Sequence, residues 1–166
     1  MNGIWLEPMT CELARRYYRE FELDPDLFLD KEKYRPYEYS PEKSDATVER
    51  YKAMGRVFMA VMLDKKPVGE VVLKEIDYVK KCCAMGISMI NNAYKNKGYG
   101  TAAEILILKY AFEILGMDTV YADAVITNVR SQRVLQKVGF TEVCRDANFV
   151  YYRYDRNCWR GINVSE

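Results

Sequence analysis

Apolar and polar residues recur along the chain with two periods, which divide it into predicted strands and helices. Short apolar or alternating runs are typical of strands, whereas apolar residues spaced three and four apart are typical of amphipathic helices. By these criteria we expect strands at 4–7, 57–63, 68–76, 82–90, 119–125, 140–145 and 149–155. We expect helices at about 10–19, 45–54, 102–115 and 129–138.

The connections between these segments predict how the strands pair. The turns at 64–67 and 78–81 are too short to connect parallel strands, so we expect the strands on either side of each turn to pair antiparallel. The strand–helix–strand unit from 82 to 125 instead predicts a right-handed crossover and parallel pairing. The sequence therefore predicts an α/β (α+β) fold, with a mixed, mostly antiparallel central sheet of six to seven strands and helices on both faces.

Capping residues indicate where the helices begin. Thr10, Ser44 and Asn128 each precede a predicted helix, and such side chains accept hydrogen bonds from the first helical amides. The segment from 22 to 41 is acidic, rich in tyrosine and interrupted by prolines. It is interpreted first as a solvated loop, and alternatively as a wall of carboxylates and rings for a cationic substrate.

Length and composition indicate a single soluble domain. The 166 residues suit one domain at 1–157 with a C-terminal tail at 158–166. The net charge of +1 provides no bulk attraction for nucleic acid or for anionic membranes. No apolar run approaches the roughly 20 residues of a membrane span, and the first residues lack a signal-peptide pattern. We therefore expect a cytoplasmic protein with no nucleic-acid or membrane partner.

The chain contains no histidine, which narrows its possible chemistry. Ser-His-Asp and Cys-His mechanisms are excluded, and the commonest ligand of transition metals is missing. We therefore expect no metal site, and proton transfer must use carboxylates, tyrosine, cysteine, lysine or water. The five cysteines include no C-x-x-C pair, which favours reduced thiols.

Two glycines and two lysines lie at the junction between a predicted strand and the longest predicted helix, in the stretch 94–101. The first turn of a helix leaves backbone N–H groups unpaired and carries partial positive charge. Glycine allows a ligand to approach that backbone closely. A phosphate group is the natural ligand for such a turn, although a solvated turn before a core helix is the simpler interpretation.

Downstream motifs favour the phosphate interpretation. Lys95-x-x-Gly98-x-Gly100 is followed by Asn128-x-x-Ser131 and then by a Lys-x-Gly-Phe run at 137–140. This series resembles the GNAT superfamily of N-acetyltransferases, over about 4–154 and most specifically over 68–140. Within that superfamily the chain is similar to the ribosomal-protein and spermidine N-acetyltransferase branch.

The resemblance implies acetyl-coenzyme A as the acetyl donor. Its diphosphate would lie on the amides of 96–101, and its pantetheine arm would follow the backbone of 88–90. Asn128 would contact the arm, cap the following helix, or do both. The coenzyme-binding residues so implied are Ser88, Met89, Ile90, Lys95, Asn96, Lys97, Gly98, Tyr99, Gly100, Thr101, Asn128, Ser131 and Lys137.

The resemblance also implies an amine acceptor, such as a polyamine, a protein N-terminus or another small amine. An alkylammonium ion must lose a proton before it attacks, so direct attack in a ternary complex needs a base. Asp123 and Glu75 are the candidate bases. Leu135 stands where many relatives have a tyrosine that protonates the leaving thiolate, so that acid is missing. The oligomeric state is left open, with a homodimer as one alternative.

Two other functions compete with an acetyltransferase. A non-catalytic acyl-coenzyme A sensor would account for Leu135. A dinucleotide-binding protein is suggested by Gly98-x-Gly100-x-x-Ala103, with Asp118 downstream. That fingerprint belongs near the start of a larger domain, whereas nearly a hundred residues precede it here. We therefore rank an active acetyltransferase first.

Overall fold

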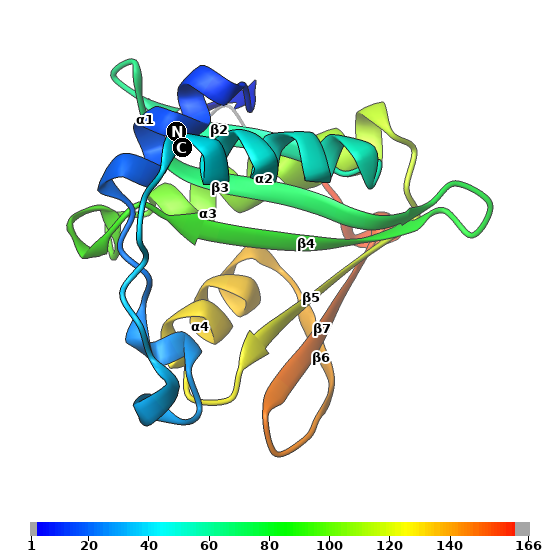
Figure 1. Cartoon of the computed structure of the whole chain (residues 1–166). Coiled ribbons are helices and arrows are strands. Elements are labelled where there is room, and N and C mark those ends of the chain that lie inside the picture. The colour runs from blue at the N-terminus through cyan, green and yellow to red at the C-terminus, as the bar shows by residue number, and fades with distance from the viewer. Residues whose placement is uncertain (1–2, 162–166) are drawn as a thin grey trace.

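The computed structural model describes residues 3–161. Within that range seven strands form one sheet in the order β1-β2-β3-β4-β5-β7-β6, in which β4 and β5 pair in parallel and the other neighbours are antiparallel (Figure 1). This arrangement confirms the predicted fold class. The strands are β1 (Trp5–Pro8), β2 (Val57–Leu63), β3 (Lys66–Asp77), β4 (Cys82–Met89), β5 (Thr119–Val125), β6 (Thr141–Arg145) and β7 (Phe149–Asp155).

Within residues 3–161, four α-helices cover the two faces of the sheet. Helices α1 (Cys11–Glu20) and α2 (Pro41–Ala53) pack on one face, which we call the α1 face, and α3 (Tyr99–Lys109) and α4 (Val129–Val138) pack on the other. A π-helical turn, η4 (Tyr110–Ile114), extends α3. Short 3-10 turns complete the fold at η1 (Pro25–Leu27), η2 (Lys31–Lys33), η3 (Asn92–Tyr94) and η5 (Arg156–Cys158).

Two of the three predicted helix caps are confirmed. The Thr10 hydroxyl accepts a hydrogen bond from the Leu13 amide, and the Asn128 side chain accepts one from the Ser131 amide. The prediction that Ser44 caps the second helix is wrong, because that helix begins one turn earlier with Ser40 as its cap. Pro41 occupies the first turn of α2, where a proline is tolerated because its missing N–H would have no partner there.

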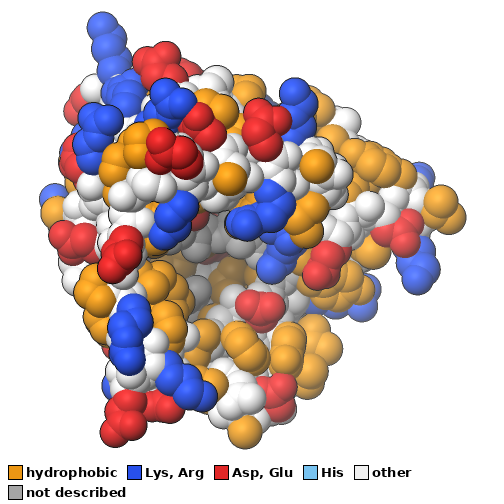
Figure 2. Space-filling view, viewed as in Figure 1, with side chains coloured by type: hydrophobic (Ala, Val, Ile, Leu, Met, Phe, Trp, Pro, Cys, Tyr) orange, Lys and Arg blue, Asp and Glu red, His pale blue; other side chains and the backbone are white. Residues whose placement is uncertain are grey.

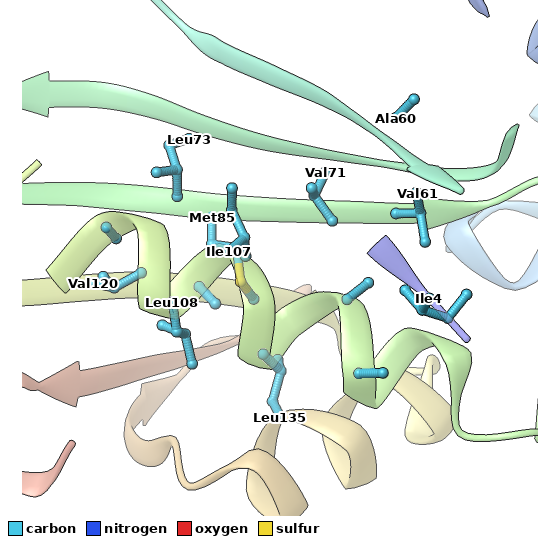
Figure 3. Close-up of a cluster of buried hydrophobic side chains, with 14 of the residues drawn as sticks. Ile4, Ala60, Val61, Val71, Leu73, Met85, Ile107, Leu108, Val120 and Leu135 are labelled. Atoms are coloured by element: carbon cyan, nitrogen blue, oxygen red, sulfur yellow. The ribbon is translucent and has the colours of Figure 1, made fainter. Parts of the chain in front are cut away.

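The core fills the space between the sheet and α3. Val71 and Leu73 of β3 point toward Ile107 and Leu108 of α3, and all four are fully buried (Figure 3). Leu135 of α4 is also buried and lies beside Leu108, so the two helices on this face are packed together. The last turns of α3 are thereby packed against both the sheet and α4.

Strands β4 and β5 pair over a short distance only. Their ladder comprises three residue pairs, which run from Cys82–Thr119 to Ala84–Tyr121. Beyond Ala84 the two strands diverge, as Figure 1 shows. The edge of β4 that faces β5 therefore has no strand partner in the described ladder over 85–89, and the sheet is split at its centre.

The C-terminal segment that was predicted to be a tail begins with ordered packing. The Trp159 ring lies 5.7 Å from the Phe112 ring, between centroids, and its indole N–H donates a hydrogen bond of 2.8 Å to Glu113. The rest of the predicted tail, residues 162–166, lies outside the described residues. The domain boundary at residue 157 stays a prediction.

Candidate active site

A cleft of about 400 Å³ opens where β4 and β5 separate. It is bounded by the end of β4, the turn that enters α3, one face of α4 and the segment 24–27. Figure 2 shows this hollow between the upper and lower halves of the molecule, with charged side chains of both signs around its rim. The residues that line the cleft are Asp24, Leu27, Ile87, Ser88, Met89, Tyr94, Lys95, Asn96, Gly98, Gly100, Thr101, Glu104, Asn128, Arg130, Ser131, Arg133, Val134 and Lys137.

The turn at the N-terminus of α3 has the backbone shape of an anion-binding loop. Asn96 and Gly98 both have positive φ, at 60° and 81°, and α3 begins immediately afterwards at Tyr99. No side chain caps the first amides of α3. A Cβ atom built on Gly100 would meet no protein atom within 4 Å, so the space above this glycine is open. Both the unpaired amides and this space suit an approaching phosphate group.

Ten of the thirteen predicted coenzyme-binding residues line this one cleft, although the chain brings them from three separate segments. The other three do not line it. Ile90 is fully buried, and its amide donates a 2.8 Å hydrogen bond to the Val68 carbonyl. Lys97 and Tyr99 belong to the turn itself but are not among the lining residues. The ten predicted residues that do line the cleft are Ser88, Met89, Lys95, Asn96, Gly98, Gly100, Thr101, Asn128, Ser131 and Lys137.

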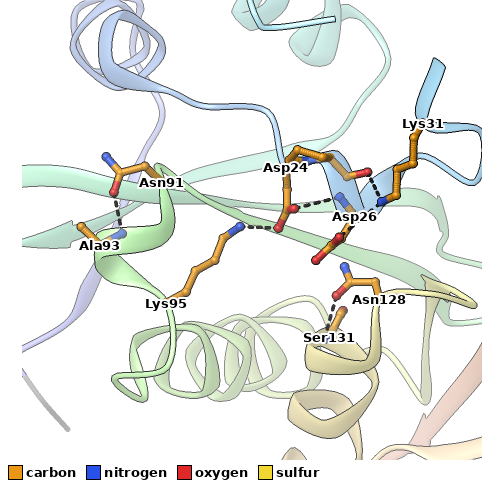
Figure 4. Close-up of polar contacts among 9 residues, drawn as sticks. Asp24, Asp26, Lys31, Asn91, Ala93, Lys95, Asn128 and Ser131 are labelled. Atoms are coloured by element: carbon orange, nitrogen blue, oxygen red, sulfur yellow. Dashed lines mark hydrogen bonds and ion pairs between the residues drawn. The ribbon is translucent and has the colours of Figure 1, made fainter. Parts of the chain in front are cut away.

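The segment before η1 is tied to the glycine turn by an ion pair. Lys95 Nζ lies 2.5 Å from Asp24 Oδ2, and the two side chains are only 13% and 17% exposed (Figure 4). Burial opposes ionisation of Asp24, but hydrogen bonds from Lys95 and from the Asp26 amide outweigh it, so the pKa of Asp24 lies below its ordinary value. The Thr127 hydroxyl also donates to the Asp26 carbonyl. The irregular segment therefore closes one side of the cleft rather than standing free as a loop.

Helix α4 contributes positive charge to the opposite side of the cleft. Arg130, Arg133 and Lys137 all line it, and they lie three or four residues apart, on one face of the helix. Of these three residues, only Lys137 was predicted from the sequence. Leu135 points away from the cleft into the α3–α4 interface and is 2% exposed.

Two carboxyl groups near the cleft were not predicted from the sequence, and the first is the partly buried Glu70 of β3. Glu70 pairs with Ser88 across the β3–β4 ladder, so both side chains point to the α1 face. The Tyr18 hydroxyl donates a 2.5 Å hydrogen bond to Glu70 Oε2. Burial raises the pKa of Glu70 to about 7, against the lowering effect of Tyr18.

Aromatic rings surround this carboxyl group on the α1 face. Tyr18 stacks on Tyr37 with ring centroids 5.5 Å apart, and Phe21 packs edge-on against both rings. The Tyr17 hydroxyl donates to the Ser88 carbonyl at 3.3 Å. A single charged residue in the otherwise apolar run 67–73 was the signal in the sequence that could have identified Glu70.

The second carboxyl group is Glu104 of α3. Its side chain is 1% exposed, it lines the cleft, and burial raises its pKa to about 8. A single acidic residue in the otherwise apolar run 102–108 was the corresponding signal in the sequence.

The two predicted bases lie in different places. Asp123 is exposed on β5 just beyond the last β4–β5 pair, and the alternation along β5 directs it to the same face as Ser88 and Glu70. Glu75 was expected to face the cleft, and that expectation is wrong. A bulge between Lys74 and Asp77 gives Glu75 a φ of 52° and breaks the alternation. Glu75 is five residues beyond Glu70 along β3, about 16 Å from the cleft end of the strand.

Two general features of the described residues bear on function. No helix in the range 3–161 is long and apolar enough to cross a membrane. The same part of the chain contains no group of three or more side chains placed to hold a metal ion.

Comparison with known proteins decides the family. Residues 4–141 match the family described as "Acetyltransferase (GNAT) domain", which is well over half of the chain. The chain belongs to the GNAT acetyltransferase family. The resemblance stated from the motifs is thereby confirmed. The matched residues include β4 and β5, so the cleft between these strands lies within the GNAT domain.

Individual GNAT relatives are distant in sequence. A Bacillus subtilis (strain 168) protein, provisionally named ribosomal N-acetyltransferase YdaF, is 27% identical over 122 residues; the match spans 68% of this chain and 66% of that relative, just under two thirds. The spermidine N-acetyltransferase of Vibrio cholerae superposes with a TM-score of 0.75 over all of both chains at 16% identity. Campylobacter jejuni N-acetyltransferase PseH, solved in complex with acetyl coenzyme A, gives 0.60 at 24% identity, over 69% of this chain and 78% of that one. At these identities the two structures show a shared fold.

Proposed function

We propose that this GNAT protein is an N-acetyltransferase that moves an acetyl group from acetyl-coenzyme A to a primary amine. The observation that carries the proposal is the single cleft that unites the glycine turn, the free edge of β4 and Asn128. These three segments are far apart in the sequence, and each supplies a different contact that an acyl-coenzyme A needs. When bound, the coenzyme would supply the activated acetyl thioester.

The residues of the cleft fit such a molecule. The uncapped amides of 98–101 and the open space above Gly100 suit a diphosphate, and Arg130, Arg133 and Lys137 add positive charge opposite. The unpaired edge of β4 at 85–89 offers backbone groups to an extended arm. An amide on this edge would polarise the thioester carbonyl as an oxyanion hole does.

Glu70 is the carboxylate that we assign as the base for the acceptor amine. It lies opposite Ser88 at the end of β4, and its pKa of about 7 suits a general base at neutral pH. Asp123 is the alternative, because it lies on the same face beside the split in the sheet. Glu75 is too far away along β3 to take this role.

The acceptor site belongs on the α1 face, where aromatic rings and carboxylates come together. Tyr18 donates to Glu70, and Phe21 and Tyr37 pack against Tyr18. An ammonium group is attracted both to such rings and to a carboxylate. A polyamine and a protein N-terminus both present an amine of this kind. The names of the relatives cover both classes, as spermidine and ribosomal N-acetyltransferases.

A non-catalytic sensor of acyl-coenzyme A is the second candidate. The observation in its favour is Leu135, whose buried side chain offers no proton to a leaving thiolate. A sensor would bind the coenzyme with the same cleft and release no free thiol.

A panel of amines, scored by the release of free coenzyme A, tests these proposals. We expect at least one of spermidine, aminoglycosides or N-terminal peptides to be acetylated. Glu70→Gln should then lower the rate by about 10²- to 10⁴-fold, the usual contribution of a general base. The wild-type rate should fall about tenfold per pH unit below pH 7, because Glu70 acts only when it is ionised.

Matched variants separate the alternatives. Glu75→Gln removes a carboxylate at the far end of the same strand and should leave the rate unchanged. Asp123→Asn should lower the rate of acetylation by less than tenfold if Glu70 is the base. A large loss in Asp123→Asn with normal activity in Glu70→Gln would transfer the role to Asp123. Coenzyme binding without turnover of any amine would favour the sensor.

A further inference from the structure

Glu104 has no evident structural reason to be in the cleft. Its side chain is 1% exposed, and Oε2 has no hydrogen-bond partner among the described residues. A buried carboxyl group without a partner destabilises a fold, whereas leucine at this position would pack against the core of α3. An unpartnered polar atom that lines a cleft is well explained if a ligand provides the partner.

The position of Glu104 indicates which part of a ligand it would meet. It lies four residues after Gly100, one helical turn deeper along α3 and on the same face. Met89 of β4 and Ser131 of α4 line the same cleft. If the diphosphate lies on the amides at the start of α3, Glu104 is beside the arm that runs from the diphosphate toward β4.

We propose that Glu104 binds the coenzyme as a neutral carboxylic acid and donates a hydrogen bond to an amide carbonyl of the pantetheine arm. This inference rests on the proposed function. An ionised carboxylate has no proton to donate and would be repelled by a nearby diphosphate, so only the protonated form is compatible with binding. Coenzyme affinity is therefore linked to pH through this one side chain.

The free protein has this proton available at neutral pH. Burial raises the pKa of Glu104 to about 8, so about nine tenths of the molecules carry the proton at pH 7 and about one tenth at pH 9. The wild-type dissociation constant for coenzyme A should therefore rise about tenfold between these pH values. Other charged or titratable groups also face the cleft, from the segment before η1, the glycine turn and α4: Asp24, Tyr94, Lys95, Arg130, Arg133 and Lys137.

Isothermal titration calorimetry with coenzyme A at pH 7, 8 and 9 tests the proposal on the full chain. Glu104→Gln keeps a hydrogen-bond donor of the same shape but cannot ionise, and it retains every other charged group of the cleft. At pH 7 the affinity of Glu104→Gln for coenzyme A should be within about threefold of the wild-type affinity. Its affinity should lack the part of the pH dependence that Glu104 contributes in wild type. Glu104→Leu should bind about five- to tenfold more weakly at pH 7, because the donor is gone.

Proton uptake gives a second readout that does not depend on turnover. Titrations at pH 9 in buffers of different ionisation enthalpy should show nearly one proton more taken up by wild type than by Glu104→Gln. Equal pH dependence in wild type and Glu104→Gln, or wild-type affinity in Glu104→Leu, would overturn the assignment of Glu104 alone. Absence of coenzyme binding to wild type at every pH would overturn the proposed function with it.

Discussion

Asp24 and Lys95 show how one ion pair can oppose ligand binding. Lys95 lies at the glycine turn, where it would attract a diphosphate, yet the structure pairs it with Asp24 at 2.5 Å. Since both side chains are largely buried, this pairing is weakly screened by salt. A phosphate that recruits Lys95 must first compete with Asp24.

We therefore expect Asp24→Asn to bind coenzyme A more tightly than wild type, by about two- to tenfold. Asparagine can still accept the hydrogen bond from the Asp26 amide that holds the start of η1, so the segment should keep its shape. Isothermal titration calorimetry at low salt measures the change, and Asp26→Asn is the control because its carboxylate pairs with Lys31 instead. Unchanged or weaker binding would mean that the pair holds Lys95 in its binding position.

Residues such as Glu70 and Glu104 mark the limit of what the sequence could predict at this scale. The glycine turn and Asn128 could be predicted because their spacing follows a local rule of helix starts. The carboxyl groups could not, because their roles depend on burial and on partners such as Tyr18, which is 52 residues away in the chain. Each glutamate interrupts an apolar run of the sequence, but that pattern does not identify what surrounds the side chain.

At the scale of elements, the spacing of apolar residues and the lengths of the turns were sufficient to predict the strands and most of the helices. The start of α2 was missed because Pro41 was interpreted as a break, whereas it occupies the first turn behind the Ser40 cap. Glu75 was misplaced because a bulge in β3 cannot be read from alternation. The lysine and glycine positions around α3 and α4 were predicted better than Arg130 and Arg133, which the sequence analysis did not include.

Helix α3 provides a test that separates fold stability from ligand binding. Gly100 lies in its first turn with an ordinary negative φ, and a Cβ atom there would meet no protein atom within 4 Å. Gly100→Ala should therefore stabilise the fold by about 0.5–1 kcal/mol, because alanine loses less backbone entropy in a helix. The same methyl group would occupy the space proposed for the diphosphate.

We accordingly expect Gly100→Ala to unfold at higher urea concentration and to bind coenzyme A at least tenfold more weakly. Urea denaturation followed by circular dichroism gives the first quantity, and calorimetry gives the second. A variant that is stabilised and still binds normally would place the diphosphate elsewhere. Weaker binding with lower stability would instead point to general damage to the helix.

For the whole molecule, the partly buried Glu70 and the buried Glu104 should govern how stability depends on pH. Burial raises the pKa of Glu70 to about 7 and of Glu104 to about 8, compared with 4.5 ordinarily. Between pH 4.5 and 8 the folded protein therefore holds protons that the unfolded chain releases. The stabilisation that this provides is complete below pH 4.5 and is lost as the pH rises through 7 and 8.

Neither histidine nor the aspartates with lowered pKa values contribute to the slope in this window. The chain has no histidine, which would otherwise titrate there. The aspartates with lowered pKa values, such as Asp24 and Asp146, lose their stabilising contributions only as the pH falls below about 4. The slope between pH 5 and 8 should therefore report mainly on Glu70 and Glu104.

The free energy of unfolding should fall as the pH is raised from 5 to 8, by at most about 1.4 kcal/mol per pH unit for each carboxyl group. Urea denaturation at pH 5, 6, 7 and 8 measures this slope. Glu104→Gln cannot ionise, so its slope should be shallower than that of wild type, most clearly between pH 6 and 8. Glu75→Gln alters an exposed carboxylate and should reproduce the wild-type slope. Parallel slopes for wild type and Glu104→Gln would show that Glu104 ionises in the folded protein as easily as in the unfolded chain, and the neutral acid proposed for the cleft would then be absent at neutral pH.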